Sequence, residues 1–275
     1  MNRMMIVFQR CCWLPCLFMA LMGGAMLTGC ASISDSGASS RKDLVTDSDE
    51  SSDRKRARIR VELAMGYLEQ GKTAIALDEV KLALAADPNF ADAYNLRGLI
   101  YMRLNEFPLA QDSFMKALSI RSGDANILHN LGWLRCQQAR YPEALADFSR
   151  ALADPAYGER SKTYMAQGLC QIRAGQRREA EQSLLKSFEF DASNPVTGYN
   201  LAKLLFQNGE FARAQFYIRR LNNSEWANAE SLWLGIKVEN RIVDQVALLQ
   251  LANQLEKRFP QSKEAAAYRR GAFDE

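Results

Sequence analysis

The sequence predicts an all-α fold built from six repeated helix pairs, and two observations support this prediction. First, the chain repeats itself about every 34 residues from residue 57 onward, as seen in AYNLRGLIYMRLNEFPLAQDSFMKALSI (93–120) and ILHNLGWLRCQQARYPEALADFSRALADP (127–155). A fixed period of this length indicates a stacked repeat architecture. Second, no stretch sustains the two-residue alternation of a half-buried strand, so we expect no sheet.

Both quoted segments carry a glycine in their first half, a central bend, and then the pattern Ala-x3-Phe-x2-Ala. Small residues in both helices allow a close approach, and larger apolar residues one turn away fill the remaining gap. This pattern resembles the tetratricopeptide repeat, a helix-turn-helix of 34 residues. The resemblance implies a right-handed superhelix of helix pairs.

The repeat region should span residues 57–275. The repeats are expected near 57–90, 91–124, 125–158, 161–194, 195–227 and 228–260. A capping helix is expected near 262–273, because the last repeat of such a stack otherwise leaves an apolar face in water.

Glycine and proline mark the expected helix ends. Gly71, Gly175 and Gly209 should end the first helices of their repeats, where a left-handed cap is needed. Pro108 and Pro142 fall in the opening turn of second helices, where the missing N–H costs little. An extra pair of residues follows the third repeat, so we expect a longer, irregular turn there.

Residues 1–29 have the features of a lipoprotein signal peptide. A positive start precedes the apolar run CCWLPCLFMALMGGAML at 11–27, and Leu-Thr-Gly-Cys closes it at Cys30. These four letters resemble the bacterial lipobox, which implies that Cys30 receives a diacylglycerol and becomes the first mature residue. The alternatives are a plain signal peptide and a membrane-spanning helix; Pro15 and Gly23-Gly24 weaken the second.

Acylation would make Cys30 a membrane anchor, since each buried methylene contributes about 0.8 kcal/mol. Ala31 and Ser32 follow the cysteine instead of Asp. In bacterial lipoproteins this implies the periplasmic face of the outer membrane. The polar residues after Cys30, up to 56, cannot bury enough surface to order themselves and are expected to form a disordered tether.

Composition and motifs argue against an enzyme. Of 35 basic residues, Arg3 and Arg10 leave with the signal, so 33 basic face 32 acidic residues, without the large positive charge of a nucleic-acid protein. His129 is the single histidine, and no metal, phosphate-binding or nucleophile motif is present. Cys136 is two helical turns from His129, too far for a nucleophile and base. We expect no cofactor and no small-molecule substrate.

Cys136 and Cys170 are the cysteines that remain in the repeat region. The periplasm permits a disulfide between them. Packed helix axes lie 8–10 Å apart, whereas a disulfide needs Cα atoms within about 7 Å. On this argument two free thiols are favoured over a bridge.

In tetratricopeptide proteins the first helices line a concave groove. Reading the inward places of each repeat gives an apolar trough, to which a partner's apolar helix or strand would bind. Its predicted residues are Val61, Met65, Leu68, Asn95, Leu99, Met102, His129, Trp133, Met165, Leu169, Ile172 and Phe206. Few inward places carry Lys or Arg, which disfavours an acidic-tail ligand. The alternative is that some of these side chains belong to the core between repeats.

The lipobox, short tether, six repeats and closing helix together resemble the type IV pilus biogenesis lipoproteins, the pilotins of the PilF/PilW family. The resemblance implies that the chain binds the secretin, the multimeric outer-membrane channel of the pilus. It would promote secretin localisation and multimerisation, and hence pilus assembly and twitching motility. The first three repeats are the expected contact. The alternative is a scaffold for murein hydrolases or outer-membrane assembly factors.

Overall fold

The structure, a computed structural model, describes residues 49–274. The signal peptide, Cys30 and most of the expected tether lie outside these residues. Within them the secondary structure is helical, without strands. Over the same residues, none of the helices combines the length and apolar character that crossing a bilayer requires.

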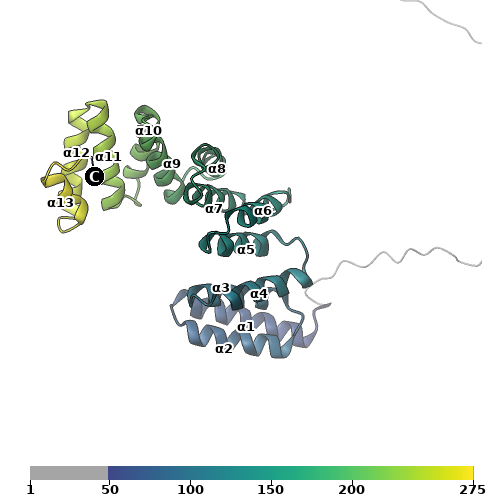
Figure 1. The fold of residues 1–275 in the computed structure, drawn as a ribbon. Helices are drawn as coiled ribbons and strands as arrows, with labels where there is room; N and C mark the ends of the chain where they lie inside the picture. Colours follow the sequence, from purple (N-terminus) through teal and green to yellow (C-terminus); the bar gives the residue numbers. More distant parts are fainter. Residues whose placement is uncertain (1–48, 275) are drawn as a thin grey trace, which may run out of the picture. The chain divides into compact units, whose positions relative to one another are not determined.

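The helices form six pairs and a closing helix (Figure 1). The first helices of the pairs are α1 (Ser52–Glu69), α3 (Ala91–Arg103), α5 (Ala125–Gln137), α7 (Arg160–Arg173), α9 (Pro195–Gln207) and α11 (Ala229–Ile242). The second helices are α2 (Thr73–Ala86), α4 (Phe107–Ile120), α6 (Tyr141–Leu152), α8 (Arg177–Phe190), α10 (Phe211–Asn222) and α12 (Gln245–Arg258). The closing helix is α13 (Lys263–Arg269).

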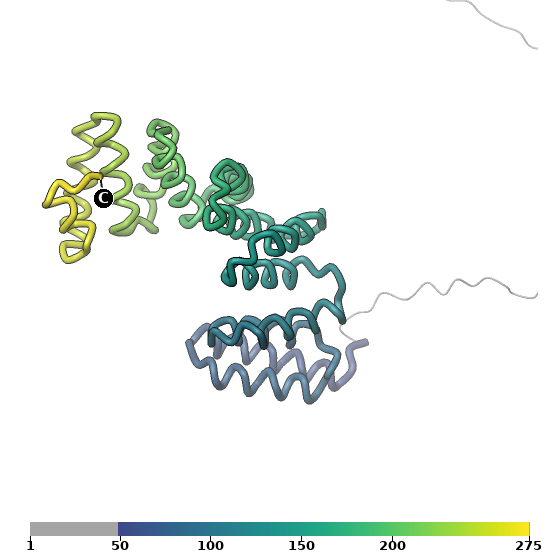
Figure 2. The backbone as a smooth tube through the Cα atoms, in the orientation of Figure 1, coloured from purple at the N-terminus to yellow at the C-terminus, as the bar shows by residue number. Residues whose placement is uncertain are grey.

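The pairs stack in chain order, as the tube in Figure 2 shows. Each odd-numbered helix from α1 to α9 contacts the next odd-numbered helix. The even-numbered helices contact odd-numbered helices but not one another. The odd helices therefore make one continuous layer, called here the inner surface of the repeat stack. The closing helix α13 packs on α11 and α12, where its Ala265 and Ala267 are buried.

The bend inside each pair uses a residue with positive φ. Gly71, Gly175 and Gly209 take this conformation, as predicted, with φ between 76° and 80°. Asn105 and Ala139 occupy the same place in the second and third pairs without glycine. The repeat geometry thus imposes the left-handed turn even where the residue does not favour it.

One helix starts before its predicted repeat, and one connection between pairs is irregular. Helix α1 starts at Ser52, ahead of residue 57, because the N–H of Arg54 donates to the Ser51 hydroxyl and caps the helix. The irregular connection expected after the third pair runs from 153 to 159. It buries Tyr157, whose hydroxyl lies 2.9 Å from Thr163 Oγ1.

The close approach within a pair depends on glycine in the first helix. A Cβ atom added to Gly98 would lie 2.4 Å from Phe114 Cε1, and one on Gly132 would lie 2.9 Å from Phe148 Cε1. Both phenyl rings are fully buried. The absence of a side chain at these glycines is therefore what lets the ring of the second helix pack on the first.

We expect Gly98→Ala to lower the free energy of unfolding by about 1–2 kcal/mol, because overpacking costs roughly 1–3 kcal/mol and the better helix propensity of Ala returns less than about 1. Gly66→Ala is the control: no atom lies within 4 Å of its added Cβ. It should stabilise the protein by about 0.5–1 kcal/mol. Urea unfolding measures both. The same sign of change in the two variants would contradict this account of the packing.

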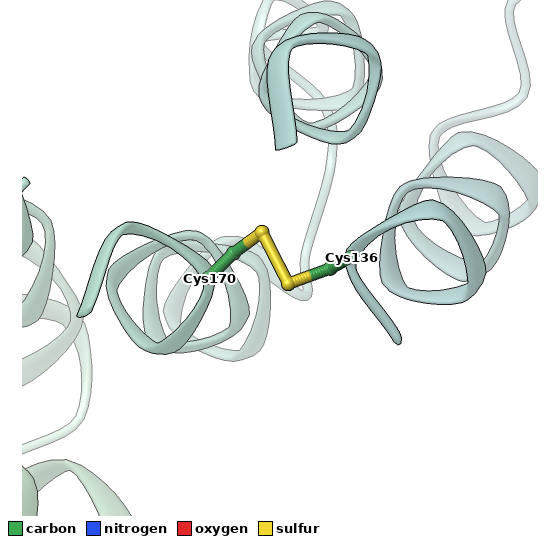
Figure 3. The surroundings of a disulfide bond; sticks show 2 residues. All are labelled: Cys136 and Cys170. Atoms are coloured by element: carbon green, nitrogen blue, oxygen red, sulfur yellow. A yellow bond between two sulfur atoms is a disulfide. The ribbon is translucent and has the colours of Figure 1, made fainter. Parts of the chain in front are cut away.

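The prediction of two free thiols is wrong. Cys136 of α5 and Cys170 of α7 form a disulfide, with their Cα atoms 5.8 Å apart (Figure 3). The axis spacing of 8–10 Å was the wrong measure. A Cα atom stands about 2.3 Å off its helix axis, so two Cα atoms that face each other at this spacing can be as close as roughly 3.5–5.5 Å. The bridge ties the third pair to the fourth across the irregular connection.

Candidate functional site

The inner surface holds an open pocket of about 400 Å³ between α1 and α3, called here the α1–α3 pocket. It brings together four of the predicted groove residues, Val61, Met65, Asn95 and Leu99. The full lining is Glu50, Arg54, Arg58, Val61, Glu62, Met65, Phe90, Asp92, Asn95, Leu96 and Leu99. Inward residues of the first two repeats thus form a single concave surface.

The floor of the α1–α3 pocket is apolar. Val61, Phe90 and Leu96 are nearly covered and belong to the hydrophobic core of the first repeats. Met65 stands above them with 48% of its surface exposed, and Leu99 is half-buried. A flexible thioether beside a leucine gives an adaptable apolar surface, of the kind that binds apolar side chains of a partner.

The rim of the pocket is charged, and its charges are paired. Arg58 Nη2 lies 3.2 Å from Glu50 Oε2 and Arg58 Nη1 lies 3.1 Å from Glu62 Oε1. These hydrogen bonds raise the pKa of Arg58 above its ordinary value. Arg54 pairs with Asp87 and lies 4.7 Å above the Phe90 ring. Since the rim charges are satisfied within the chain, the apolar floor is the part left for a partner.

The remaining predicted groove residues, apart from His129, are half-buried. This group consists of Leu68, Met102, Trp133, Met165, Leu169, Ile172 and Phe206. Leu68 packs on the first cluster and Ile172 and Phe206 on the cluster around α9. The Trp133 ring is also covered by the Arg173 guanidinium, 5.1 Å from its centroid. Among the twelve predicted residues, Met65 offers the most exposed apolar side chain.

His129 lies in the interior, with 7% of its surface exposed. Its Nδ1 is 2.8 Å from Thr163 Oγ1, and its ring is 5.9 Å from that of Phe148. Burial, helped by the charge of Lys162, lowers the pKa of His129 to about 4. The imidazole therefore links α5 to α7, and Cys136, held in the disulfide, offers it no thiol partner.

The buried imidazole should make stability depend on pH. Below pH 6.5 the unfolded imidazole binds a proton, while the folded one stays neutral until about pH 4. The folded state then loses stability as the pH falls through this window, by about 2 kcal/mol between pH 7 and pH 5. Urea unfolding of the wild type and His129→Gln at both pH values checks this. The variant should lose markedly less over the same interval; an equal loss would contradict the assignment to His129.

Sequence reasoning missed part of the inner surface. A second open pocket, called here the C-terminal pocket, lies between α9, α11 and α13 and includes Trp233 and Lys237. Tyr199, Lys203 and Phe206 of the fifth repeat also line it. Lys237 follows Lys203 by 34 residues, which is one repeat length. Extending the list of inward positions to the sixth repeat with this period would therefore have identified Lys237.

Comparisons with known proteins agree on the architecture. Residues 89–154 match the family model of the tetratricopeptide repeat. Over 240 residues the chain is 30% identical to the type IV pilus assembly protein PilF of Pseudomonas aeruginosa, an alignment that covers 86% of this chain and 91% of PilF. The fold class predicted from the sequence, a tetratricopeptide superhelix, is confirmed, and scaffolds of this kind are typical of non-enzymatic adaptors.

Solved structures give the same result. The structure of Pseudomonas aeruginosa PilF matches with a TM-score of 0.72 at 28% identity, over 80% of this chain and 100% of that one. The crystal structure of PilW, described as a widely conserved type IV pilus biogenesis factor, matches with a TM-score of 0.70 at 31% identity, over 77% and 97% of the two chains.

Proposed function

Because the chain belongs to the family of type IV pilus tetratricopeptide proteins that includes PilF and PilW, we propose that it is a pilotin, an adaptor without catalytic activity. In this role it binds subunits of the pilus secretin and promotes their multimerisation in the outer membrane. The similarity to PilF over nearly the whole length of both chains is the observation that carries the proposal.

The proposal includes a lipid anchor at Cys30. Support comes from the sequence Leu-Thr-Gly-Cys after an apolar run, with Ala31 and Ser32 directing the protein to the periplasmic face of the outer membrane. The acyl chains would hold the repeats at the membrane in which the secretin must insert. Tethering raises the effective concentration of bound secretin subunits there, and so favours their assembly.

The α1–α3 pocket is the proposed secretin contact. Its floor is apolar, and the charged side chains of its rim pair within the chain. Such a pocket fits an apolar segment that the secretin buries only after insertion. Met65 supplies an exposed, adaptable side chain to this surface. The groove would shield the segment from water until the subunits meet.

Substitution of Met65 tests the contact. Met65→Glu places a charge in the α1–α3 pocket and should lower secretin affinity at least tenfold and reduce secretin multimers in the outer membrane. Met115→Glu is the matched control, since Met115 is 49% exposed on the outer helix α4. Immunoblots of membrane fractions and circular dichroism of the purified variants measure assembly and folding.

Further experiments test the lipid anchor, the pocket contact and the pilotin role separately. Cys30→Ala should keep secretin binding but leave multimers outside the outer membrane; normal outer-membrane fractionation would refute the anchor. If Met65→Glu and Met115→Glu support the same level of multimers, the pocket is not the contact. Recovery of murein hydrolases or outer-membrane assembly factors without secretin in pull-downs would replace the pilotin role with a scaffold role.

A further inference from the structure

The N-terminal end of the repeat stack presents an uncovered helix face on α1. An open hollow of about 400 Å³, called here the α1 end face, is lined by Ile59, Glu62, Leu63, Gly66, Tyr67 and Gln70. Ile59 and Leu63 expose 48% and 46% of their surface. The helical period puts this face opposite Ala57 and Ala64, which are buried in the first core cluster. The α1 end face therefore points away from the chain's own core.

In the next four repeats the residues at the same places are buried. Those that correspond to Ile59 are Ala93, Ile127, Thr163 and Thr197, and those that correspond to Gly66 are Ile100, Leu134, Cys170 and Leu204. Each of them is at most 2% exposed. Ala93 and Ile100 share a core cluster with Val80 of α2, so these places receive the helices of the preceding pair. The α1 end face thus has the form of a helix-binding surface, and within residues 49–274 no helix covers it.

Gly66 has no packing role among the described residues. A Cβ atom added to it would meet nothing within 4 Å. By contrast, Gly98 and Gly132 are each required by a phenyl ring of the same pair. Glycine inside a helix destabilises that helix relative to Ala, and it is used where another backbone must approach closely. The gap at Gly66 therefore suits a helix from outside the chain, whereas a bilayer surface has no need of it.

The charges of α1 are divided between its two halves. Five of the nine residues 52–60 are basic, whereas residues 61–69 hold two acids and no base. Arg56 is 69% exposed, and its partner Asp53 is 59% exposed, so little is lost when Arg56 turns to another acid. A second α1 that runs in the opposite direction would set its acidic half beside this basic half and align the two helix dipoles favourably. The helix is complementary to itself in an antiparallel pair.

We infer that two copies of this chain associate through the α1 end face, as an antiparallel pair of α1 helices. The two-fold axis crosses α1 between residues 62 and 63. Ile59 of one copy then lies over Gly66 of the other. The same register brings Arg56 opposite Glu69, and symmetry repeats each contact. This association does not depend on the proposed secretin contact.

The helix pair is a small interface. One helix face per copy is smaller than the roughly 800 Å² that each partner of a standard complex buries, so we expect a reversible dimer whose population rises with concentration. Anchoring both copies in one membrane would raise their effective concentration. Basic and exposed apolar side chains also occur on helices that lie on a membrane. The gap at Gly66 and the acidic second half of α1 favour a second copy of the helix over an anionic bilayer.

Sedimentation equilibrium of the full chain in a density-matched detergent tests the inference. The wild type should show a monomer–dimer equilibrium. Gly66→Leu fills the hollow and should weaken the dimer at least tenfold. In dilute solution the same variant should resist urea better than the wild type, because Leu is the better helix former and a Cβ atom at this place meets no neighbour. A monomeric wild type, or equal dimerisation of the two proteins, would overturn the inference.

Charge reversal tests the antiparallel arrangement. Arg56→Glu and Glu69→Arg should each weaken the dimer at least threefold, since each sets like charges opposite each other. Combined in one chain, the two substitutions restore opposite pairs between copies and should recover the wild-type affinity. Thirteen residues of helix separate the two places by about 20 Å, so recovery must come from contacts between copies. Lys186→Glu with Glu189→Lys, an exposed pair on α8, is the control and should dimerise as the wild type does. No recovery in the combined variant would refute the antiparallel pair.

Oxidative cross-linking in cells tests the contact with the full chain. Leu63→Cys places the thiols of two copies beside the two-fold axis and should give a disulfide-linked dimer. Met115→Cys, at a place of nearly equal exposure on α4, should remain monomeric. Adding Met65→Glu should keep the cross-link even where secretin binding is lost, which separates this face from the α1–α3 pocket. A cross-link to a different protein in place of the dimer would refute the inference.

Fluorescence distinguishes the second copy from a bilayer. Leu63→Cys labelled with nitrobenzoxadiazole is reconstituted in liposomes of phosphatidylglycerol and phosphatidylethanolamine at one chain per vesicle. Emission equal to that of labelled Met115→Cys supports a contact between copies, since no second copy is then present. A blue shift at this density would place the α1 end face in the bilayer and overturn the inference.

Discussion

Loss of the Cys136–Cys170 disulfide is expected to lower the free energy of unfolding by roughly 3–4 kcal/mol. The bridge joins cysteines that are 34 residues apart in the sequence, so it removes the freedom of a whole repeat from the unfolded chain. In a protein of this size that loss corresponds to a melting temperature about 6–16 °C lower. The bridge is therefore among the largest single contributions to stability that the described residues show.

The bridge also lies where the stack is least regular. It spans the interface between α5 and α7, next to the connection 153–159 and the hydrogen bond between His129 and Thr163. Both sulfur-bearing side chains are buried. We expect that the third and fourth pairs separate more easily from each other once the bridge is absent.

Comparison of the wild type with Cys136→Ala/Cys170→Ala by urea unfolding measures the effect. A reductant added during unfolding should destabilise the wild type towards the level of the double variant and leave the double variant unchanged. Both proteins should remain helical at low urea, since the repeats keep their hydrophobic cores. Equal stability of the oxidised wild type and the double variant would show that the bridge does not constrain the unfolded chain.

The fold could be predicted because its determinants are local and repeated. Gly98 and Phe114 are 16 residues apart, and the same pair recurs as Gly132 and Phe148 one repeat later. The left-handed bends were visible only where glycine marks them. Val243 has φ 67° although β-branched residues disfavour this conformation, so no local signal shows that bend.

The candidate site could be predicted less well. The helical period indicates the face on which a side chain lies, but it does not indicate how deeply that side chain is buried. Met65 and Val61 share one stripe of α1, yet the first is 48% exposed and the second 7%. Val61 belongs to the core cluster that also contains Ala93 and Leu96 of α3, whereas Met65 does not. His129 was assigned to the groove for the same reason, and the structure buries it in contact with Thr163 of α7.

Buried ion pairs between helices were not predicted at all. Arg135 stands where an apolar residue is common in such repeats, and it lies 2.5 Å from the buried Asp147 of α6. Arg219 of α10 pairs likewise with Glu239 of α11, whose side chain is fully buried. These partners are set by the packing of one helix on another, for which a period of 34 residues carries no information.

The Arg219–Glu239 pair should be the most sensitive ionic contact of the C-terminal repeats. Arg219 Nε and Nη2 lie 2.7 Å and 2.8 Å from the two carboxylate oxygens of Glu239, and these hydrogen bonds raise the pKa of Arg219. Gln215 Nε2 adds a third hydrogen bond at 2.8 Å. Arg219→Ala leaves the Glu239 carboxylate in the interior with the amide alone, and we expect a loss of about 3–5 kcal/mol.

Arg213→Ala is the matched control for this substitution. Arg213 is also on α10, and 44% of its side chain is exposed against 43% for Arg219. Its partners Glu181 and Glu210 are themselves partly exposed, so its removal should cost less than about 1 kcal/mol. Urea unfolding distinguishes the two cases, and similar losses would show that burial of the carboxylate does not determine the cost.

A double substitution distinguishes two contributions to the free energy of unfolding. One is the destabilisation by an unpaired buried charge, and the other is the stabilisation by the Arg219–Glu239 pair itself. Arg219→Met with Glu239→Met replaces both charges by apolar side chains of similar length, so no buried charge is left unpaired. We expect this variant to recover most of the stability that Arg219→Ala loses. If the double variant is as unstable as Arg219→Ala, the hydrogen bonds between the two side chains are themselves the main contribution. Recovery would instead mean that Arg219 is required chiefly because Glu239 is buried where α10 meets α11.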